Sequence, residues 1–351
     1  MRKTAALGSV PRMLALVIDG AFGLDNLRIV ERPVPKPERG QVLLRMRAGS
    51  LNYRDLLMVR GEYNPRQALP LVIGSDGVGE VVEVGSGVLR VRAGQRVCPN
   101  FMQAWQAGEP TRERLRSSLG GPFDGTLAEY MLVDAESLVL VPDYLTDEEA
   151  ACLPCAGLTA WSALVTYGNT PAGGTILTQG TGGVSIFAVQ VAKVLGQRVI
   201  ATSSGADKLE RLRALGADHV LNYSEDSEWG ETARKLTGGV GVDQVIEVAG
   251  GKGLAQSIRA TRPGGQISVI GVLSGRVSDF NITPILMQNM RLQGITVGHR
   301  DGFDAMNRAF AAHQTRPVVD RVFSLQEGRA ALDYLASGAH FGKICIRIAH
   351  A

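Results

Sequence analysis

Short apolar runs alternate with segments of helical length in the second half of the chain, and this alternation constrains the fold more than any other feature. Strands that alternate with helices of about ten residues form βαβ units, whose strands lie parallel in one sheet. Such strands are buried on both faces, which explains why the runs VIATSS and ISVIG show little polar alternation. The predicted strands span 176–179, 199–201, 219–221, 244–248 and 266–270, and the predicted helices span 184–195, 207–215, 229–236 and 254–260.

The rest of the chain is richer in β-structure. Runs of Val, Ile and Leu between turn clusters predict strands at 13–18, 27–31, 41–48, 78–84 and 128–133. A helical segment at 147–164 precedes the βα series. The tail then continues with a strand at 292–297, helices at 303–312 and 325–336, and extended segments at 318–323 and 343–348. Residues 99–124 show little periodicity and either shape the mouth of a pocket or face solvent.

These patterns predict an α/β fold with two domains. A doubly wound parallel-sheet domain of residues 141–314 is inserted into a β-rich domain made of residues 13–140 and 315–351, and residues 1–12 form a flexible N-terminal extension. Glycine accounts for 43 of the 351 residues. This exceeds its usual share of about 7% and fits the many tight turns that such a fold needs.

Charge and composition exclude several kinds of partner. The 37 Lys and Arg residues against 34 Asp and Glu leave a net charge of +3, and the basic residues are scattered, so we expect no nucleic-acid partner. No apolar run approaches the roughly 20 residues of a membrane span, and the first dozen residues lack the apolar core of a secretory signal. Four cysteines are too few for a disulfide scaffold. We therefore expect a cytoplasmic protein with no membrane partner.

The strongest chemical signal is the glycine-rich turn after the first strand of the parallel series. Gly180 permits a tight turn, Gly182 beside Gly183 lets the backbone approach a ligand, and a helix begins at once with Val184. The free N–H groups and the positive end of the helix dipole then face an anion such as a pyrophosphate. Ser185 stands where the usual G-x-G-x-x-G spacing has its third glycine. A plain βα turn is the alternative, but the surrounding βα repeats favour a dinucleotide site.

The end of the second parallel strand indicates which nucleotide binds. An acidic residue at this place would hydrogen-bond the ribose 2′-OH of NAD. This chain has Thr202, Ser203 and Ser204 there, with Lys208 one turn into the next helix. Hydroxyl groups and an ammonium accept a 2′-phosphate that a carboxylate would repel, so we predict NADP(H) as the cofactor. The alternative is an ordinary serine N-cap beside a solvated lysine.

Five motifs follow one another along the chain. They are Asn52-Tyr-Arg-Asp55, Gly74-Ser-Asp-Gly-Val-Gly-Glu-Val-Val-Glu-Val-Gly85, Gly125-Thr-Leu-Ala-Glu-Tyr130, Ala156-Gly-Leu-Thr-Ala160 and Gln179-Gly-Thr-Gly-Gly183. With them the chain from Met13 onward resembles the medium-chain dehydrogenase/reductase superfamily, and within it the zinc-independent quinone oxidoreductase-like branch. The resemblance implies a GroES-like catalytic domain split around a Rossmann domain, with the cofactor in the cleft between them. It also implies a homodimer or homotetramer, for which the strand at 292–297 is a candidate edge.

Zinc-dependent members of this superfamily hold a catalytic metal with a cysteine, a histidine and a second cysteine. The resemblance places Asn52 and Ser75 at the first two positions, Asp76 at the glutamate that follows the histidine, and a thiol only at Cys155. One thiolate with an amide and a hydroxyl does not make a Zn²⁺ site. The four cysteines of the structural zinc lobe are reduced to Cys98, so we predict no metal.

The loss of the metal ligands favours one kind of reaction. Without a Lewis acid an alkoxide is hard to stabilise, so we predict hydride transfer from NADPH to a quinone or an α,β-unsaturated carbonyl compound. The branch implies that Asn52 positions the nicotinamide ribose or the substrate oxygen, that Asp55 orients these partners, and that Tyr63 donates a hydrogen bond or a proton. Tyr63 is otherwise only an aromatic residue of a loop. Two other functions stay open, a zinc-using secondary alcohol dehydrogenase and an NADPH-binding protein without catalysis.

Further residues are implied on the cofactor side. Thr159 contacts the nicotinamide half, and Tyr223 helps to hold the adenosine phosphate. Lys343 either reaches the cofactor from the tail or is a surface lysine. Three residues end later strands at the edge where a parallel sheet places its ligand. They are Val248, Gly271 and Leu273.

Overall fold

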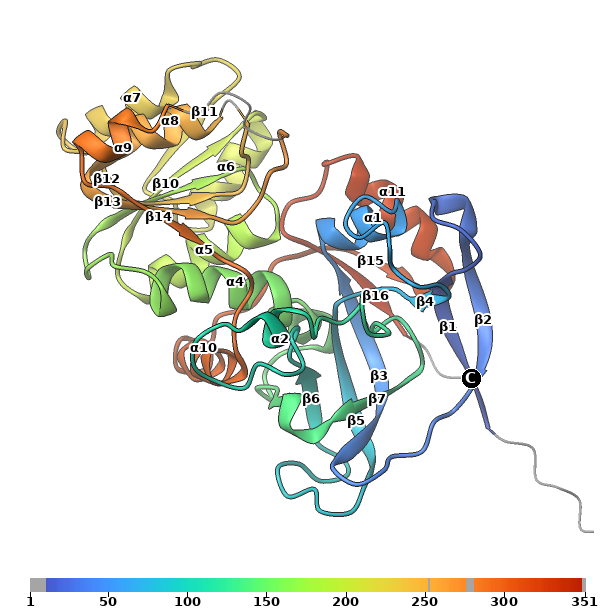
Figure 1. Cartoon of the computed structure of the whole chain (residues 1–351). Helices are drawn as coiled ribbons and strands as arrows, with labels where there is room; N and C mark the ends of the chain where they lie inside the picture. Colours follow the sequence, from blue (N-terminus) through green and yellow to red (C-terminus); the bar gives the residue numbers. More distant parts are fainter. Residues whose placement is uncertain (1–10, 252, 276–280, 349–351) are drawn as a thin grey trace, which may run out of the picture.

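The computed structural model describes residues 11–251, 253–275 and 281–348. Figure 1 shows two domains side by side, with the parallel sheet in the upper left and the β-rich part in the lower right. Residues 1–10 of the predicted extension lie outside the described residues, and Arg12 already begins the first strand. No helix in the described ranges combines the length and the apolar character needed to cross a bilayer.

Six parallel strands form the sheet of the upper domain, in the order β11-β10-β9-β12-β13-β14. These strands are β9 (Thr175–Gln179), β10 (Arg198–Ser203), β11 (His219–Asn222), β12 (Val242–Glu247), β13 (Thr261–Val269) and β14 (Arg291–Gly294). The helices between them are α5 (Gly183–Val194), α6 (Ala206–Ala214), α7 (Trp229–Leu236), α8 (Gly253–Ala260) and α9 (Thr283–Met287). The predicted doubly wound parallel sheet is therefore confirmed.

Both faces of this sheet are buried, each in a separate apolar cluster. Ile176 of β9 packs on one face with Phe187 of α5, and α10 (Arg300–His313) covers the same side. Leu177, the next residue, belongs to the opposite cluster with Trp229 of α7. Successive side chains of a strand point to opposite faces, so a strand covered by helices on both sides must be apolar throughout.

The strand order reverses between β9 and β12, because β10 and β11 lie on one side of β9 and the later strands on the other. Such a point leaves a crevice at the carboxyl ends of the strands, where open α/β sheets bind their ligands. A buried network joins the two strands there. Gln179 donates to Glu247 at 2.9 Å and to Ser257 of α8 at 2.7 Å, and Glu247 accepts the backbone N–H of Gly250 at 2.8 Å.

The β-rich domain contains a seven-stranded sheet with the order β15-β16-β3-β5-β6-β8, in which β7 also pairs with β3. A second sheet has the order β2-β1-β4. The strands are β1 (Arg12–Ile18), β2 (Leu27–Pro33), β3 (Gln41–Leu51), β4 (Leu71–Val72), β5 (Asp76–Val84), β6 (Arg96–Pro99), β7 (Tyr130–Asp134), β8 (Leu138–Leu140), β15 (Val319–Ser324) and β16 (Lys343–Arg347). Because β16 from the tail pairs with β3 from the first part, the parallel-sheet domain is inserted between two halves of one sheet.

Several helical elements refine the sequence prediction. The segment predicted as one helix at 147–164 begins with the expected Thr146 cap, which forms a capping box with Glu149. It then widens into π-helical turns, the first of which contains Pro154, a residue without the N–H that a regular turn requires. Its parts are α3 (Asp147–Ala151), a π-turn (Leu153–Gly157), α4 (Leu158–Trp161) and a π-turn (Ser162–Thr166). The other helices are α1 (Tyr53–Val59), which was not predicted, α2 (Arg112–Leu115), inside the irregular segment 99–124, and α11 (Gly328–Ala336).

The two domains touch where the tail meets the glycine-rich turn. The backbone N–H of Gly342 donates to the carbonyl of Thr181 at 2.9 Å, and Gly342 forms a parallel bridge with Gly182. The start of β16 therefore lies against the start of α5. This contact brings a residue of the catalytic-domain sheet to the predicted phosphate-binding turn.

Candidate active site

The glycine-rich turn lies at the carboxyl end of β9, beside the point where the strand order reverses. Gly180 has a φ of 71°, a left-handed conformation that favours glycine. A Cβ added at Gly180 or Gly182 would meet no described atom within 4 Å, so the space above the turn is open. Gly183 and Val184 begin α5, whose first N–H groups are not capped by any described side chain. An open backbone at a helix N-terminus fits the pyrophosphate of a dinucleotide.

The residues predicted to receive the 2′-phosphate lie along the same edge of the sheet. Ser203 ends β10 and is buried, whereas Ser204 is exposed. Lys208, in the first turn of α6, donates from Nζ to the carbonyl of Gly338 at 2.8 Å, just after α11. Tyr223 follows β11, and its backbone N–H donates to the carbonyl of Ser203 at 3.2 Å. The structure thus brings two hydroxyl groups, an ammonium and a phenol to one edge, with the ammonium already held by a carbonyl.

The remaining residues predicted to bind the cofactor extend this edge toward the later strands. Thr159 is buried in α4, and Val248 directly follows β12. Gly271 and Leu273 follow β13, and Leu273 is exposed. A Cβ at Gly271 would lie 2.5 Å from the carbonyl oxygen of Val248, so this glycine is needed for the close approach of two strand ends. The carboxyl ends of parallel strands share one edge, which explains why residues so far apart in sequence are neighbours here.

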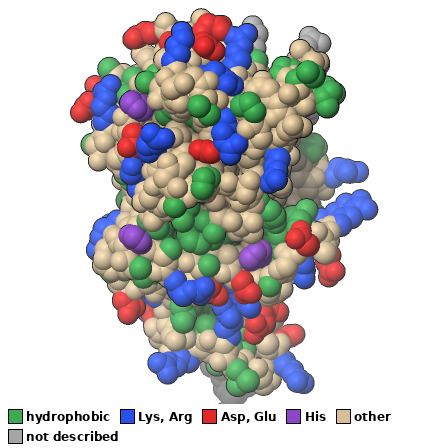
Figure 2. Space-filling view, turned by 90° about the vertical axis from the view of Figure 1, so that its left-hand side faces the viewer, with side chains coloured by type: hydrophobic (Ala, Val, Ile, Leu, Met, Phe, Trp, Pro, Cys, Tyr) green, Lys and Arg blue, Asp and Glu red, His purple; other side chains and the backbone are tan. Residues whose placement is uncertain are grey.

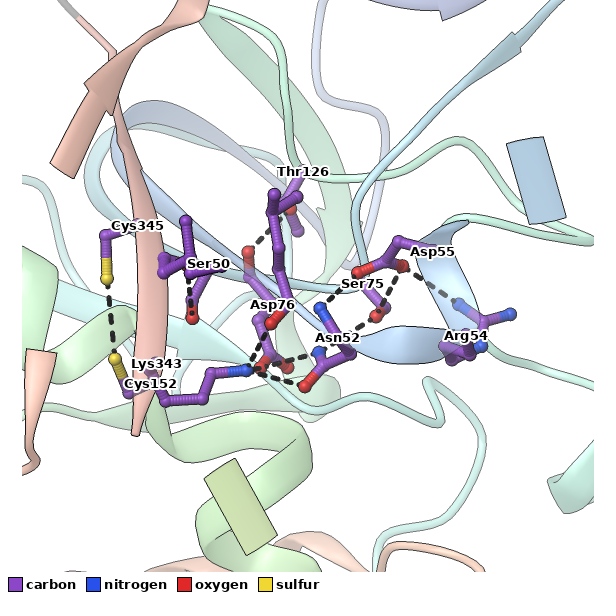
Figure 3. Close-up of polar contacts among 12 residues, drawn as sticks. Ser50, Asn52, Arg54, Asp55, Ser75, Asp76, Thr126, Cys152, Lys343 and Cys345 are labelled. Atoms are coloured by element: carbon purple, nitrogen blue, oxygen red, sulfur yellow. Dashed lines mark hydrogen bonds and ion pairs between the residues drawn. The ribbon is translucent and has the colours of Figure 1, made fainter. Parts of the chain in front are cut away.

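A cluster of buried polar side chains lies where β16 meets the start of α1 (Figure 3). Lys343 is only 3% exposed, so its interpretation as a surface lysine is wrong. Its Nζ donates to the carbonyl of Leu51 at 2.7 Å and to Oδ1 of Asn52 at 2.6 Å, and it lies 3.4 Å from Oδ2 of Asp76. Burial is the largest single effect and lowers the pKa of Lys343, but the charge of Asp76 and those of the neighbouring groups together outweigh it, and the net shift is upward. The ammonium therefore stays charged inside the protein.

The side-chain amide of Asn52 is the centre of this cluster. Its Nδ2 donates to Oδ2 of Asp76 at 2.9 Å and lies 3.3 Å from Oγ of Ser75, while Oδ1 accepts from Lys343. The amide has only two N–H groups, and both have partners inside the cluster. Its predicted role toward a substrate or ribose oxygen therefore requires these contacts to change.

Asp55 belongs to the first turn of α1, and its side chain is buried. Its Oδ2 accepts the backbone N–H of Asn52 at 2.8 Å, which completes a capping box, and its Oδ1 accepts the hydroxyl of Ser75 at 2.9 Å. Burial raises the pKa of Asp55, against the opposing effect of the Arg54 guanidinium. These two hydrogen bonds of Asp55 fix the backbone of Asn52 and the hydroxyl of Ser75. They are compatible with the predicted role of Asp55 in orienting its neighbours.

Tyr63 lies outside the cluster and is 51% exposed. Its ring faces the guanidinium of Arg54, whose central carbon is 4.8 Å from the ring centroid and 5.0 Å from that of Phe101. The same guanidinium donates to the carbonyls of Leu119 at 2.9 Å and Gly121 at 3.2 Å. Arg54 thus fastens the loop of Tyr63 and the segment 99–124 to α1. The predicted role of Tyr63 as a donor stays a prediction.

Asp76 carries an unusual charge state. It is fully buried, and its Oδ1 has no hydrogen-bond partner among the described residues. Burial raises the pKa of Asp76 to about 7; Lys343 and Asn52 act in the opposite direction, and the Asp55 carboxylate raises it further. The carboxyl group therefore changes its charge near neutral pH.

These residues do not fit a zinc ion. Cys155 is the one thiol among the positions that the resemblance assigns to metal ligands, and burial raises its pKa. The amide of Asn52 is occupied by its neighbours, and the Lys343 ammonium lies beside it. Within the described ranges no group of three His, Cys, Asp or Glu residues could hold a metal ion. A Zn²⁺ ion needs several deprotonated or neutral N, O or S ligands, which this cluster does not supply.

The role of one residue of the site, Arg54, was not predicted from the sequence. Arg54 stands inside a quoted motif, but its function depends on carbonyls more than sixty residues away.

Comparisons with known proteins agree with this architecture. Residues 38–143 match the family described as alcohol dehydrogenase GroES-like domain, and residues 183–312 match the one described as zinc-binding dehydrogenase. A zinc-type alcohol dehydrogenase-like protein of Schizosaccharomyces pombe is 40% identical over 95% of this chain and 98% of its own length. An acryloyl-coenzyme A reductase of Metallosphaera sedula is 31% identical over 95% of this chain and 99% of its own.

Solved structures are similar over nearly the whole chain. A crystal structure of an NAD-dependent alcohol dehydrogenase is 32% identical with a TM-score of 0.88, covering 96% of this chain and 100% of that one. A mycobacterial quinone oxidoreductase is 27% identical with a TM-score of 0.80, covering 95% and 99%. A mycobacterial protein complexed with NADPH is 27% identical with a TM-score of 0.81 and the same coverage.

We expect Asp76→Asn to change how stability depends on pH. Since the folded-state pKa of Asp76 is raised from 3.8 to about 7, the folded protein keeps a proton in this window that the unfolded chain releases. The free energy of unfolding therefore falls as the pH rises between about 4 and 7, by up to about 1.4 kcal/mol per pH unit from this group. Urea denaturation across this range measures the slope. Glu83→Gln, an exposed change in the same strand, is the control, and equal slopes for wild type and Asp76→Asn would contradict the assignment.

Proposed function

Since the chain belongs to the medium-chain dehydrogenase/reductase superfamily, we propose that it is a reductase that passes a hydride from NADPH to a quinone or an α,β-unsaturated carbonyl compound without a metal ion. The buried cluster around Lys343 carries this proposal. An amide and a hydroxyl, from Asn52 and Ser75, stand where the zinc-dependent members have metal ligands, and an ammonium is bonded to the amide. A divalent cation there would meet a positive charge and a neutral thiol, so chemistry without a Lewis acid suits the site.

Conjugated acceptors match such a site. When a hydride adds to an enone or a quinone, the negative charge spreads over the conjugated system, and modest hydrogen-bond donors stabilise it. A simple alkoxide concentrates the charge on one oxygen and needs a stronger electrophile. Two of the similar proteins bear names, acryloyl-coenzyme A reductase and quinone oxidoreductase, that point to acceptors of this kind.

The chain's own residues hold the cofactor in this proposal. NADPH, when bound, supplies the hydride from its reduced nicotinamide. The turn Gly180–Gly183 and the N-terminus of α5 receive the pyrophosphate. Ser203, Ser204 and Lys208 receive the 2′-phosphate, and Lys208 exchanges the Gly338 carbonyl for a phosphate oxygen. The similar structures include both an NAD-dependent enzyme and an NADPH complex. The proposed preference for NADPH over NADH therefore rests on Ser203, Ser204 and Lys208.

The three proposed catalytic residues act at different distances from the reacting atoms. Asn52 is half-buried and is the group we assign to the substrate oxygen or the nicotinamide ribose. Asp55 and Ser75 position Asn52 through the capping box and the hydroxyl bond. Tyr63 is exposed on its loop, where Arg54 orients its ring, and we assign it to the mouth of the site as a donor.

We expect NADPH oxidation to depend on a conjugated acceptor. Purified protein is mixed with NADPH and 1,2-quinones, 1,4-quinones, alkyl enones or simple aldehydes, and the loss of nicotinamide absorbance is followed. Turnover with quinones or enones and none with simple aldehydes is the expected result. Oxidation of secondary alcohols as the main activity would favour the metal-dependent alternative. NADPH binding without turnover of any acceptor would favour a binding protein without catalysis.

We expect the double variant Ser203→Asp/Lys208→Ala to shift the cofactor preference toward NADH. The new carboxylate repels a 2′-phosphate and accepts the 2′-OH of NADH, and the loss of the ammonium removes a phosphate partner. The ratio of kcat/KM for NADPH to that for NADH is expected to fall at least about 10-fold, the effect of losing one charge-assisted contact. Lys235→Ala, on α7, is the control. An unchanged ratio in the double variant would show that the 2′-phosphate of NADPH does not bind at this edge of the sheet.

The free edge of the parallel sheet supports a homodimer or homotetramer. β14 is the last strand of the sheet among the described residues, and Leu286 and Met287 of α9 beside it are 72% and 74% exposed. The face in Figure 2, on the side of the molecule that carries α9, has hydrophobic side chains gathered across its middle and at its upper right. The exposed large apolar residues after β13, around α9 and in β14 are Val272, Leu273, Ile282, Leu286, Met287 and Leu292. Patches of this kind and unpaired strand edges mark interaction sites.

We expect Leu286→Glu/Met287→Glu to break this assembly, because two buried charges without partners oppose association. Light scattering coupled to size exclusion then gives the mass of one chain, whereas the wild type gives a dimer or tetramer. Leu89→Glu, at a residue 97% exposed on the other domain, leaves the wild-type mass unchanged. A double variant that kept the wild-type mass would place the interface elsewhere.

A further inference from the structure

Lys343 connects the polar cluster with the glycine-rich turn. Its backbone follows Gly342, which is hydrogen-bonded to Thr181 of the turn at 2.9 Å. Its side-chain stem crosses the start of α5, since a Cβ added at Gly183 would lie 2.6 Å from Cδ of Lys343. The stem thus lies over the helix N-terminus that we assign to the pyrophosphate, while the ammonium points onward to Asn52 and Asp76 (Figure 3).

The ammonium is held by three oxygen atoms, only one of which carries charge. The carbonyl of Leu51 and Oδ1 of Asn52 are the close partners, at 2.7 and 2.6 Å, and Oδ2 of Asp76 is at 3.4 Å. Asp76 is fully buried, and its other oxygen has no partner in the described part of the chain. The other charged or titratable groups that act on Asp76 or feel its charge are Asp55 of α1, Cys98 of β6 and Cys155 of the π-turn. Lys343 is therefore the cation that compensates the Asp76 carboxylate.

We propose that Asp76 competes with the cofactor pyrophosphate for the ammonium of Lys343, so that this buried carboxylate weakens cofactor binding and returns the lysine to Asn52 when the cofactor leaves. The proposal rests on the proposed function, because it needs a dinucleotide at the turn. A lysine ammonium is compact, has three donors and sits on a flexible four-carbon stem, so a change of oxygen partners requires only side-chain rotation. Asp76 is a positioning residue in this scheme.

The competition also affects Asn52. While the ammonium is bonded to Oδ1, the amide is fixed by Lys343 on one side and by Asp76 and Ser75 on the other. When Lys343 turns to the pyrophosphate, Oδ1 loses its donor and the amide gains freedom to bond a ribose or substrate oxygen. Cofactor binding and the preparation of the substrate site are then linked through one lysine.

The test is the dissociation constant of NADPH for the apo-protein, measured by nucleotide fluorescence or calorimetry at about pH 8, above the usual range of carboxyl pKa values. Asp76→Asn keeps the shape of the side chain and removes its charge. We expect it to bind NADPH about 3- to 10-fold more tightly, the range of one weakened charge-assisted hydrogen bond. Tighter binding is not a result that a damaged fold would produce.

Two further variants separate this effect from a general change in charge. Lys343→Met is expected to weaken binding at least about 10-fold. Adding Asp76→Asn to Lys343→Met is expected to give no further change. Glu83→Gln removes an exposed carboxylate of β5, the strand that carries Asp76, and it is expected to leave the dissociation constant unchanged. If Asp76→Asn does not fold, Asp76→Ser is expected to show the same tightening.

Three results would overturn the proposal. Unchanged or weaker NADPH binding by both Asp76 variants would show that the carboxylate does not compete for the lysine. If Asp76→Asn tightened NADPH binding equally in the wild type and in Lys343→Met, the effect would come from the lost negative charge and not from competition for the lysine. If the wild-type protein bound no dinucleotide, the proposed function would be wrong, and this inference would fail with it. The first two results, by contrast, would overturn this inference and leave the proposed function standing.

Discussion

A buried ammonium needs compensating oxygen atoms, because moving a charge out of water costs several kcal/mol. Lys343 finds them in the carbonyl of Leu51, the amide of Asn52 and the carboxylate of Asp76, and the rest of the site is arranged around this contact. The amide is fixed because its oxygen accepts from the lysine and its nitrogen donates to Asp76. The protein thus holds a positive charge beside the amide of Asn52, and its partners fix the position of this charge.

The architecture places this ammonium next to the turn that we propose for the cofactor pyrophosphate. β16 pairs with β3 of its own sheet and touches the glycine-rich turn of the parallel-sheet domain through Gly342. One strand therefore belongs to the catalytic domain and also borders the proposed cofactor crevice. Because the stem of Lys343 crosses the start of α5, a Cβ at position 183 would lie 2.6 Å from its Cδ, and a larger residue there would displace the lysine. The turn, the tail strand and the polar cluster depend on one another sterically as well as electrostatically.

The sequence predicted what depends on local periodicity. The βα series, the Thr146 cap and the glycine-rich turn follow from spacing over a few residues, and the structure contains all three. The absence of a metal stays a prediction, which rests on the motifs in which Asn52 and Ser75 stand. The burial of Lys343 could not, since its partners Asn52 and Asp76 lie 291 and 267 residues away in the chain. Arg54 and Asp55 share a motif with Asn52, but only the fold shows that one fastens the 99–124 segment and the other caps α1. Helix α1 was missed because its short apolar run carries no clear period.

The central claim is that this cluster supports hydride transfer with an ammonium and an amide in place of a metal. A single turnover with NADPH deuterated at the reactive carbon of the nicotinamide tests it most directly, using protein that elemental analysis shows to be free of transition metals. The account predicts that the label appears on the β-carbon of an enone product, at the same rate with and without a chelator. Label transfer that is absent from the metal-free protein and restored by added Zn²⁺ would contradict it.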